Sequence, residues 1–390
     1  MIGASRYVAV AGVAATVTFV ATPLVEKFAR RVGWVVEPDA RRVHTKATPD
    51  VGGIAMFLGF LAAMAAAWAM GSFRSIFAGN SEALGLLVGC GVVFLVGLVD
   101  DIKEISAPAK VTGIVLGAVV FVIFGVNMYY FRVPFMDVFL LGQNWVPLIT
   151  VLWLLGLTNA INLIDGLDGL AAGIVAIAAL AFFIYSRRLD HLNLLGPQNI
   201  GPLVAVIAAG VCVGFLPHNF NPAKIFMGDG GALFLGALMA VSTSVVGGRA
   251  DPNVQRFRGQ TYFFFAPLVI PLVILGVPIF DMLFAIVRRA TRRQGLAVAD
   301  KGHLHHRLMR LGHGQKRAVL ILWAWTALLS GFVLYPAFTR IGSIWVPIGL
   351  AALALALYTA FRPRWRRGRG PGADGESPED LPMSSGSARL

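Results

Sequence analysis

The chain has 390 residues, of which 57% are hydrophobic and only 14% are charged, and its formal net charge is +13. This composition excludes an ordinary soluble globular protein, in which about 25% of the residues are charged. Uncharged stretches long enough to cross a bilayer recur along nearly the whole chain, so no room remains for a sizeable soluble domain.

Eleven uncharged stretches of at least 17 residues follow one another along the sequence. A helix needs about 20 apolar residues to cross a bilayer core of roughly 30 Å. Barrel strands are excluded because the stretches are too long and lack strict alternation of polar and apolar residues. We therefore predict an all-α, polytopic membrane protein with eleven transmembrane helices, in which residues 1–361 form one transmembrane domain. The predicted spans are residues 7–25, 51–73, 83–99, 111–131, 138–164, 169–186, 192–217, 230–248, 259–280, 318–339 and 341–361.

The distribution of basic residues predicts how these spans are oriented. The first stretch is long and has no convincing small-residue cleavage site, so we expect it to be retained as a span. Alternating the eleven spans places 24 of the 33 lysines and arginines on the side of residues 26–50 and 9 on the opposite side. By the positive-inside rule, the first side is cytoplasmic, with the N-terminus outside and the C-terminus inside. The excess of basic residues is thus explained by the orientation of the spans, and we expect no nucleic-acid partner. The predicted location is the inner (plasma) membrane.

The last residues of the chain differ in composition from the rest. Residues 362–390 begin with a cluster of arginines and continue with glycine, proline, serine and acidic residues. Such a segment cannot bury enough apolar surface to fold alone, so we predict a disordered tail.

Two adjacent carboxylates, Asp100 and Asp101, end the third stretch. Neighbouring carboxylates repel one another and are costly near lipid unless a cation or a basic group offsets their charge. A divalent metal or a role as a base would account for the pair. For an isolated pair, a solvated helix end remains the simpler interpretation.

A second polar group closes the fifth stretch, where Asn159, Asn162, Asp165 and Asp168 recur every three residues. On a helix each of these side chains is displaced by only about 60° from the previous one, so the four form one polar stripe. Packing gives no reason for four polar groups at the end of a span. We therefore expect the stripe to face a binding site on the cytoplasmic side.

Residues 219–231 lead into the eighth stretch and include Asn219, Lys224, Phe226 and Asp229. Asp229 could be a plain helix cap. The free amides of a helix N-terminus with a lysine nearby also suit a phosphate, or a metal that carries one. Phe226 could stack on a base or pack at the membrane interface.

The most basic loop contains His303, His305, His306 and Arg307. A zinc site of the hydrolytic type is not expected, because neither a His-Glu-x-x-His helix nor cysteine partners accompany the histidines. Histidines among arginines suit an anionic ligand with several phosphates. Asp281, at the end of the ninth span, is equally well explained by a functional role and by a structural partner in a neighbouring helix.

Together, the acidic pairs, the phosphate-binding helix start and the basic histidine loop on one membrane face suggest transfer between a soluble phosphorylated donor and a lipid acceptor. The chain resembles the polyprenyl-phosphate N-acetylhexosamine-1-phosphate transferases, which include MraY and the WecA/TagO-type enzymes. The resemblance covers essentially all eleven spans. Its motifs are Pro38-Asp39-Ala40-Arg41-Arg42-Val43-His44 with Pro49 and Gly52-Gly53, Asp100-Asp101 with Lys110, Asn159 to Leu170, Pro222 to Asp229, and His303-x-His305-His306.

The resemblance implies roles for these residues. Asp229 would bind magnesium, with manganese as the alternative, and Phe226 would face the uracil of the donor. Asp100 or Asp101 would deprotonate the lipid phosphate or, less simply, attack the donor to form a covalent intermediate. The implied substrate-binding residues also include Arg41, His44, Lys103, Lys110, Asn159, Asn162, Asp165, Asp168, Asn219, Lys224, His303, His305, His306 and Arg307.

The His-Leu-His-His-Arg sequence of the last motif is similar to the WecA/TagO branch, which favours UDP-N-acetylglucosamine over UDP-muramoyl-pentapeptide as the donor. The acceptor implied is undecaprenyl or decaprenyl phosphate, and a homodimer is compatible with the resemblance. The rival class is a secondary transporter, which would place charged sites near the midplane and show internal repeats. The carboxylates here gather at one face, and the halves of the sequence show no repeat.

Overall fold

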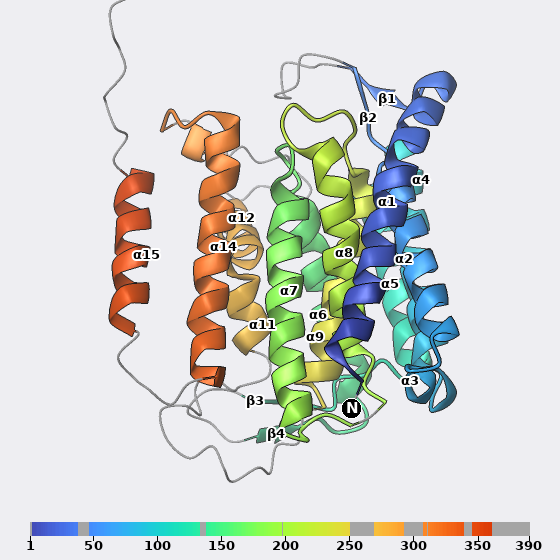
Figure 1. Cartoon of the computed structure of the whole chain (residues 1–390). Coiled ribbons are helices and arrows are strands. Elements are labelled where there is room, and N and C mark those ends of the chain that lie inside the picture. The colour runs from blue at the N-terminus through green and yellow to red at the C-terminus, as the bar shows by residue number, and fades with distance from the viewer. Residues whose placement is uncertain are drawn as a thin grey trace, which may run out of the picture.

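The computed structural model describes residues 2–37, 47–132, 138–196, 198–249, 269–291, 307–309, 311–338 and 345–360. Helices account for most of this part of the chain, and they stand side by side in a bundle (Figure 1). They are α1 (Ala4–Val32), α2 (Gly53–Ala69), α3 (Arg74–Ala78), α4 (Glu82–Lys103), α5 (Ala107–Ile123), α6 (Trp145–Ile164), α7 (Leu170–His191), α8 (Gly201–Asn219), α9 (Gly228–Gly247), α11 (Val269–Ile274), α12 (Gly276–Thr291), α14 (Gln315–Phe338) and α15 (Trp345–Ala360).

The prediction of an all-α, polytopic membrane protein is confirmed. Within the described residues, seven helices are long and apolar enough to cross a membrane, and shorter apolar helices lie at Gly53–Ala69, Ala107–Ile123 and Ile348–Thr359. Each of the eleven predicted spans contains helix in its described part. The count of eleven spans and the orientation of the termini stay predictions.

Two details differ from the predicted spans. The described part of the ninth span is two helices, α11 and α12, that meet at Leu275. Residues at the edges of the fourth and fifth spans form a small antiparallel sheet, in which β3 (Tyr130–Arg132) pairs with β4 (Val138–Leu140) and Phe131 lies opposite Phe139. Aromatic and β-branched side chains favour this extended conformation over the end of a helix.

A second two-stranded sheet lies at the other end of the bundle. It joins β1 (Val35–Val36), just after α1, to β2 (Thr48–Pro49), just before α2, with Val35 opposite Pro49. Figure 1 shows this sheet at the end of the bundle away from the N-terminus. This end also holds the last turn of α4 and the first turns of α7 and α9.

The centre of the bundle is α9, which packs against α2, α4, α6 and α8. All of its residues except Asp229 are buried. Small residues such as Gly230, Gly231 and Gly236 let neighbouring helices approach closely, as is common between membrane helices. Asp229, in the first turn, is thus carried by the most enclosed helix of the described structure.

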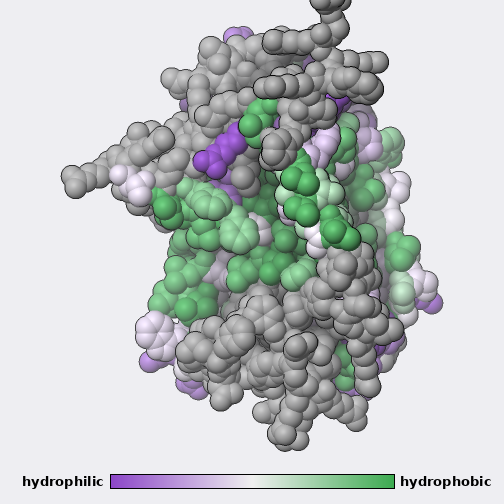
Figure 2. Space-filling model, turned by 90° about the vertical axis from the view of Figure 1, so that its left-hand side faces the viewer, coloured by the Kyte–Doolittle hydropathy of each residue, from purple (hydrophilic) through white to green (hydrophobic). Residues whose placement is uncertain are grey.

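The outer helices expose apolar side chains, as lipid contact requires. Phe19 and Leu24 on α1 and Leu353 on α15 are about half exposed or more. The face in Figure 2 carries hydrophobic side chains in its middle and hydrophilic ones toward its ends. This distribution matches a bundle whose middle lies in hydrocarbon and whose ends meet water.

Candidate active site

The first turn of α9 brings together polar side chains from three other helices. Asp229 Oδ1 accepts a hydrogen bond of 2.6 Å from Asn162 Nδ2, at the end of α6. Asp229 Oδ2 pairs with the ammonium of Lys110, in the first turn of α5. The same ammonium lies 3.0 Å from Asp100 Oδ2, in the last turn of α4. Four residues predicted from three separate motifs therefore form one cluster of hydrogen bonds and ion pairs at one end of the bundle.

Asp101 contacts the backbone of α9. Its Oδ1 accepts from the amide of Asp229 at 2.6 Å, and its Oδ2 accepts from the amide of Gly230 at 2.9 Å. Asp100 has other partners, since its Oδ1 accepts from the amide of Ile105 and its Oδ2 contacts the Lys110 ammonium. Consecutive residues on a helix are rotated by about 100°, so the two adjacent carboxylates have different partners.

The segment before α9 is held against the segment before α2 by main-chain hydrogen bonds. The Phe226 amide donates to the Pro49 carbonyl, and the Gly52 amide donates to the Phe226 carbonyl, both at 2.9 Å. A Cβ on Gly52 would lie 2.5 Å from the Phe226 carbonyl oxygen, and one on Gly228 would lie 2.3 Å from the Asp50 carbonyl oxygen. The approach therefore requires glycine, and Gly228 also has a φ of +68°.

Asp165 is partly buried just beyond the end of α6. Loss of solvent, followed by repulsion from the carboxylates of Asp50, Asp229 and Asp168, raises its pKa well above the ordinary value for an aspartate. The cluster thus gathers more negative charge than its own lysine offsets. Such a site favours a bound cation.

Asp168 has a structural contact that the sequence did not predict. Its Oδ2 accepts from Asn221 Nδ2 at 2.8 Å and from the Ala223 amide at 3.1 Å. Asn221 Nδ2 also donates to Gln315 Oε1, at the start of α14. Asp168 therefore fixes the loop before α9, and through Asn221 it is connected to α14.

Asn219 also binds backbone. Its Oδ1 accepts from the Gly169 amide and its Nδ2 donates to the Ile225 carbonyl, both at 3.0 Å, and the residue is only 2% exposed. Asn219 thereby joins the start of α7 to the loop before α9, and its role in substrate binding stays a prediction.

The other predicted residues are not among the four of this cluster, and some lie outside the described part of the chain. Lys103, Lys224 and Arg307 are exposed, and Phe226 is half-buried. Asn159 donates to the Leu155 carbonyl of its own helix, and Asp281 on α12 is only 2% exposed. The remaining calls lie outside the described residues: Arg41, His44, His303, His305 and His306.

Sequence reasoning missed Asp50, Asn221 and Gln315. Asp50 lies between Pro49 and the Gly52-Gly53 pair of the first motif, and that position was the available signal. Asn221 lies inside the motif before α9. Gln315 had no local signal, because its contact with Asn221 joins residues 94 positions apart.

The donor atoms of the cluster suit magnesium. Within the described residues, no group of three His, Cys, Asp or Glu side chains forms a preassembled metal site. Magnesium does not need one, since it binds through one or two carboxylates and completes its shell with water and substrate phosphate. Asp229 and Asp165 offer hard oxygen ligands of this kind, and the repulsion at Asp165 would be relieved by a cation.

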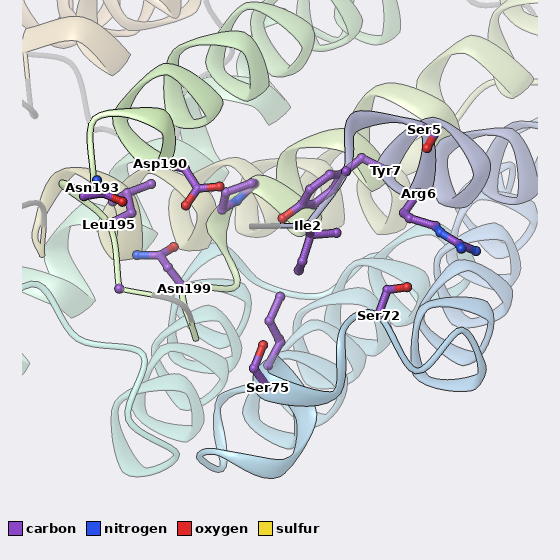
Figure 3. Close-up of a pocket in the computed structure, with 14 residues that line it drawn as sticks. Ile2, Ser5, Arg6, Tyr7, Ser72, Ser75, Asp190, Asn193, Leu195 and Asn199 are labelled. Atoms are coloured by element: carbon purple, nitrogen blue, oxygen red, sulfur yellow. The ribbon is translucent and has the colours of Figure 1, made fainter.

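A cavity of about 570 Å³ lies at the opposite end of the bundle. Figure 3 shows Tyr7 of α1, Asp190 of α7 and Asn199, which precedes α8, around it. Asp190 Oδ2 is 2.5 Å from Arg187 Nη1, and the Arg187 guanidinium carbon lies 5.2 Å from the Tyr7 ring centroid. This cavity is separate from the carboxylate cluster.

The bundle has helices that are long and apolar enough to cross a membrane, and a cluster of carboxylate and amide side chains lies at one of its ends. These features define a polytopic membrane enzyme. Residues 83–247 match the family model described as glycosyl transferase family 4. The chain is 35% identical over 323 residues to the decaprenyl-phosphate N-acetylglucosaminephosphotransferase of Mycobacterium tuberculosis, with 81% of this chain and 79% of the relative covered. It is 36% identical to the probable undecaprenyl-phosphate N-acetylglucosaminyl 1-phosphate transferase of Bacillus subtilis, with 80% and 78% covered.

A relative with a different name matches at lower identity. The phospho-N-acetylmuramoyl-pentapeptide-transferase of Moorella thermoacetica is 32% identical over 341 residues, with 83% of this chain and 96% of the relative covered. The chain therefore belongs to glycosyl transferase family 4, and it is a membrane-bound transferase.

Proposed function

We propose that the protein transfers N-acetylglucosamine-1-phosphate from UDP-N-acetylglucosamine to undecaprenyl or decaprenyl phosphate, with release of UMP. The product, polyprenyl-diphospho-N-acetylglucosamine, would start the synthesis of a cell-envelope polysaccharide. The names of the M. tuberculosis and B. subtilis relatives support the reaction. The observation that carries the proposal is the cluster of Asp229, Asn162, Lys110 and Asp100 at one end of a membrane bundle.

In the proposed reaction an oxygen of the lipid phosphate attacks the β-phosphorus of the donor in line with the departing UMP. One P–O bond forms to the lipid phosphate, and the bond between the β-phosphorus and the bridging oxygen breaks. Asp100 takes the proton of the lipid phosphate as a general base. Lys110 holds the Asp100 carboxylate through their 3.0 Å ion pair and places a positive charge beside the reacting phosphates.

Asp229, with Asp165 beside it, would hold magnesium or manganese together with the donor diphosphate. The ion would supply positive charge that stabilises the charge developing on the phosphate oxygens. Asn162 fixes the Asp229 carboxylate through its 2.6 Å hydrogen bond. The half-buried ring of Phe226 lies on the loop that leads into α9 and is proposed to face the uracil.

The remaining motif residues are proposed to bind the donor. Lys103, Lys224 and Arg307 are exposed cations that can neutralise the diphosphate from outside the cluster. The active site would then face the cytoplasm, where nucleotide sugars are found, in a plasma-membrane protein that could work as a homodimer. Proposed donor-binding residues also include Arg41, His44, His303, His305 and His306.

The test uses purified protein in detergent with polyprenyl phosphate and magnesium. Labelled UDP-N-acetylglucosamine and labelled UDP-muramoyl-pentapeptide are offered in parallel, and UMP release and lipid-linked label are followed. We expect label in lipid from the first donor alone, and loss of that label in Asp229→Asn. Asp190→Asn, at the opposite end of the bundle, is the matched control and should retain transfer.

The alternative function is transfer of phospho-N-acetylmuramoyl-pentapeptide, which the relative from M. thermoacetica favours. Label in lipid from the second donor alone would establish that alternative. Absence of transfer from both donors, with folded protein and magnesium present, would overturn the assignment of the donor.

A further inference from the structure

The two adjacent aspartates at the end of α4 have different partners, and the difference assigns them different tasks. Asp100 contacts Lys110, whose ammonium also contacts Asp229. Asp101 uses both carboxylate oxygens for backbone amides of α9. Asp100 thus directs one oxygen to the ammonium that also contacts Asp229, whereas both oxygens of Asp101 are held by the backbone of α9.

The first turn of α9 needs such an acceptor. The first amides of a helix have no partner within the helix and are usually capped by a side chain at the preceding position. That position is Met227, whose side chain accepts no hydrogen bond. Asp101 supplies the missing cap from a different helix.

The packing of α4 against α9 is built for this contact. Gly97 lies four residues before Asp101 and so on the same face of α4. A Cβ on Gly97 would lie 2.5 Å from both the Asp229 carbonyl oxygen and the Gly230 nitrogen. Gly97 thus lets the backbone of α9 approach α4, and Asp101 fixes the amides of the turn that carries Asp229.

We propose that Asp101 is a positioning residue, which caps α9 from α4 and thereby fixes the orientation of Asp229, whereas Asp100 is the member of the pair that faces the reacting groups. The capping role does not depend on the proposed reaction. The division of labour between the two aspartates rests on the proposed function.

The capping role is tested by hydrogen–deuterium exchange of the peptide that covers residues 228–235, in protein without substrate or metal. Asp101→Ala removes both acceptors, whereas Asp101→Asn keeps one acceptor oxygen. We expect exchange in this peptide to be at least tenfold faster in Asp101→Ala and intermediate in Asp101→Asn. Asp100→Asn is the matched control and should leave the exchange of this peptide unchanged. Unchanged exchange in Asp101→Ala would overturn the proposal whether or not the protein is active.

The division of labour is tested by the pH dependence of kcat. Asp101→Asn should keep measurable transfer, with the acidic limb of the pH profile at its wild-type position, and Asp101→Ala should be slower still. Asp100→Asn should remove that limb. If Asp101→Asn removes the limb and is as inactive as Asp101→Ala, then Asp101 is the base and the proposal fails. If Asp101→Ala does not fold, Asp101→Asn carries the test, and unchanged exchange of residues 228–235 in that variant would overturn the proposal.

Discussion

The acidic residues at the two ends of the bundle have different kinds of charged partner. At the end away from the N-terminus, Asp100 and Asp229 share one lysine, Lys110, and Asp165 is repelled by the carboxylate of Asp229. At the opposite end, Glu82 pairs with Arg249, and Asp190 pairs with Arg187. A carboxylate that has its own arginine is neutralised by the protein itself.

The Glu82–Arg249 pair shows what the second kind of end does. Arg249 also donates to the carbonyls of Gly125 and Asn127, and its guanidinium carbon lies 5.3 Å from the centroid of the Tyr129 ring. The arginine thereby joins the start of α4 to the segment after α5 and to the end of α9. This end fastens helices, whereas the cluster around Asp229 leaves negative charge for a ligand.

The largest expected effect is a loss of activity at the end of the bundle that holds Asp229. Asp229→Asn should lower kcat by about 10³-fold, because the site loses the carboxylate that is proposed to hold the metal ion at the donor diphosphate. The melting temperature should not fall, since a repulsive charge has been removed. UMP release and thermal unfolding of the same preparation measure both quantities. A variant that keeps more than a tenth of wild-type activity would contradict the assignment of Asp229.

The second largest effect is a loss of stability at the opposite end of the bundle, where Glu82 pairs with Arg249. Arg249→Met leaves the Glu82 carboxylate, only 6% exposed, without its partner and should lower the free energy of unfolding by about 3 kcal/mol. Activity per folded molecule should remain close to that of the wild type. Adding Glu82→Gln should restore part of the stability, and absence of any recovery in the double variant would argue against the ion pair as the cause.

The third effect is a pH dependence at the Asp229 end. The folded protein raises the pKa of Asp165, so it binds a proton that the unfolded chain releases above its ordinary pKa of about 3.9. This contribution is present below that value and is lost as the pH rises through the higher folded-state pKa. With chelator present, stability should fall with rising pH in the wild type and less steeply in Asp165→Asn. Thermal unfolding midpoints across this range measure the slope, and equal slopes in the two proteins would contradict the prediction.

The smallest effect concerns the connection between the site and α14. Gln315→Ala removes one acceptor of Asn221 and should cost about 1 kcal/mol of stability. Asn221 keeps its hydrogen bond to Asp168, so the change in kcat should stay within a few fold. Gln315→Glu keeps an acceptor oxygen and is the control, and a larger loss in Gln315→Glu than in Gln315→Ala would show that charge rather than the hydrogen bond matters.

Much of the fold could be predicted because a membrane span is a property of local composition. A long apolar stretch gains by leaving water whatever its neighbours are, so the stretches that became α1, α4 and α9 were visible in the sequence. The pairing of β3 with β4 was not visible, since it depends on register between two short segments. The break at Leu275 between α11 and α12 also lacked a charged or polar marker.

The site was predicted in part for a similar reason. The motifs at the ends of the apolar stretches are recognisable in the sequence because their polar residues have no packing role. The structure brings four of these residues together: Asp229, Asn162, Asp100 and Lys110. The partners of Asp101 could not be predicted, because they depend on how α4 is rotated against α9. Asn219 and Asp168 have the same polar character as ligands, and only their tertiary contacts reveal that they bind backbone amides.

The glycines around Asp229 have a consequence for how this family can vary. Gly52, Gly53, Gly97 and Gly228 each place a neighbour's backbone within 2.5 Å of where a Cβ would be. A clash with a side chain can be relieved by a second substitution that shortens that side chain, but a clash with a backbone cannot. No second substitution can therefore compensate for the replacement of any of these four glycines. Sequence variation in the site is expected instead at the side chains that line it.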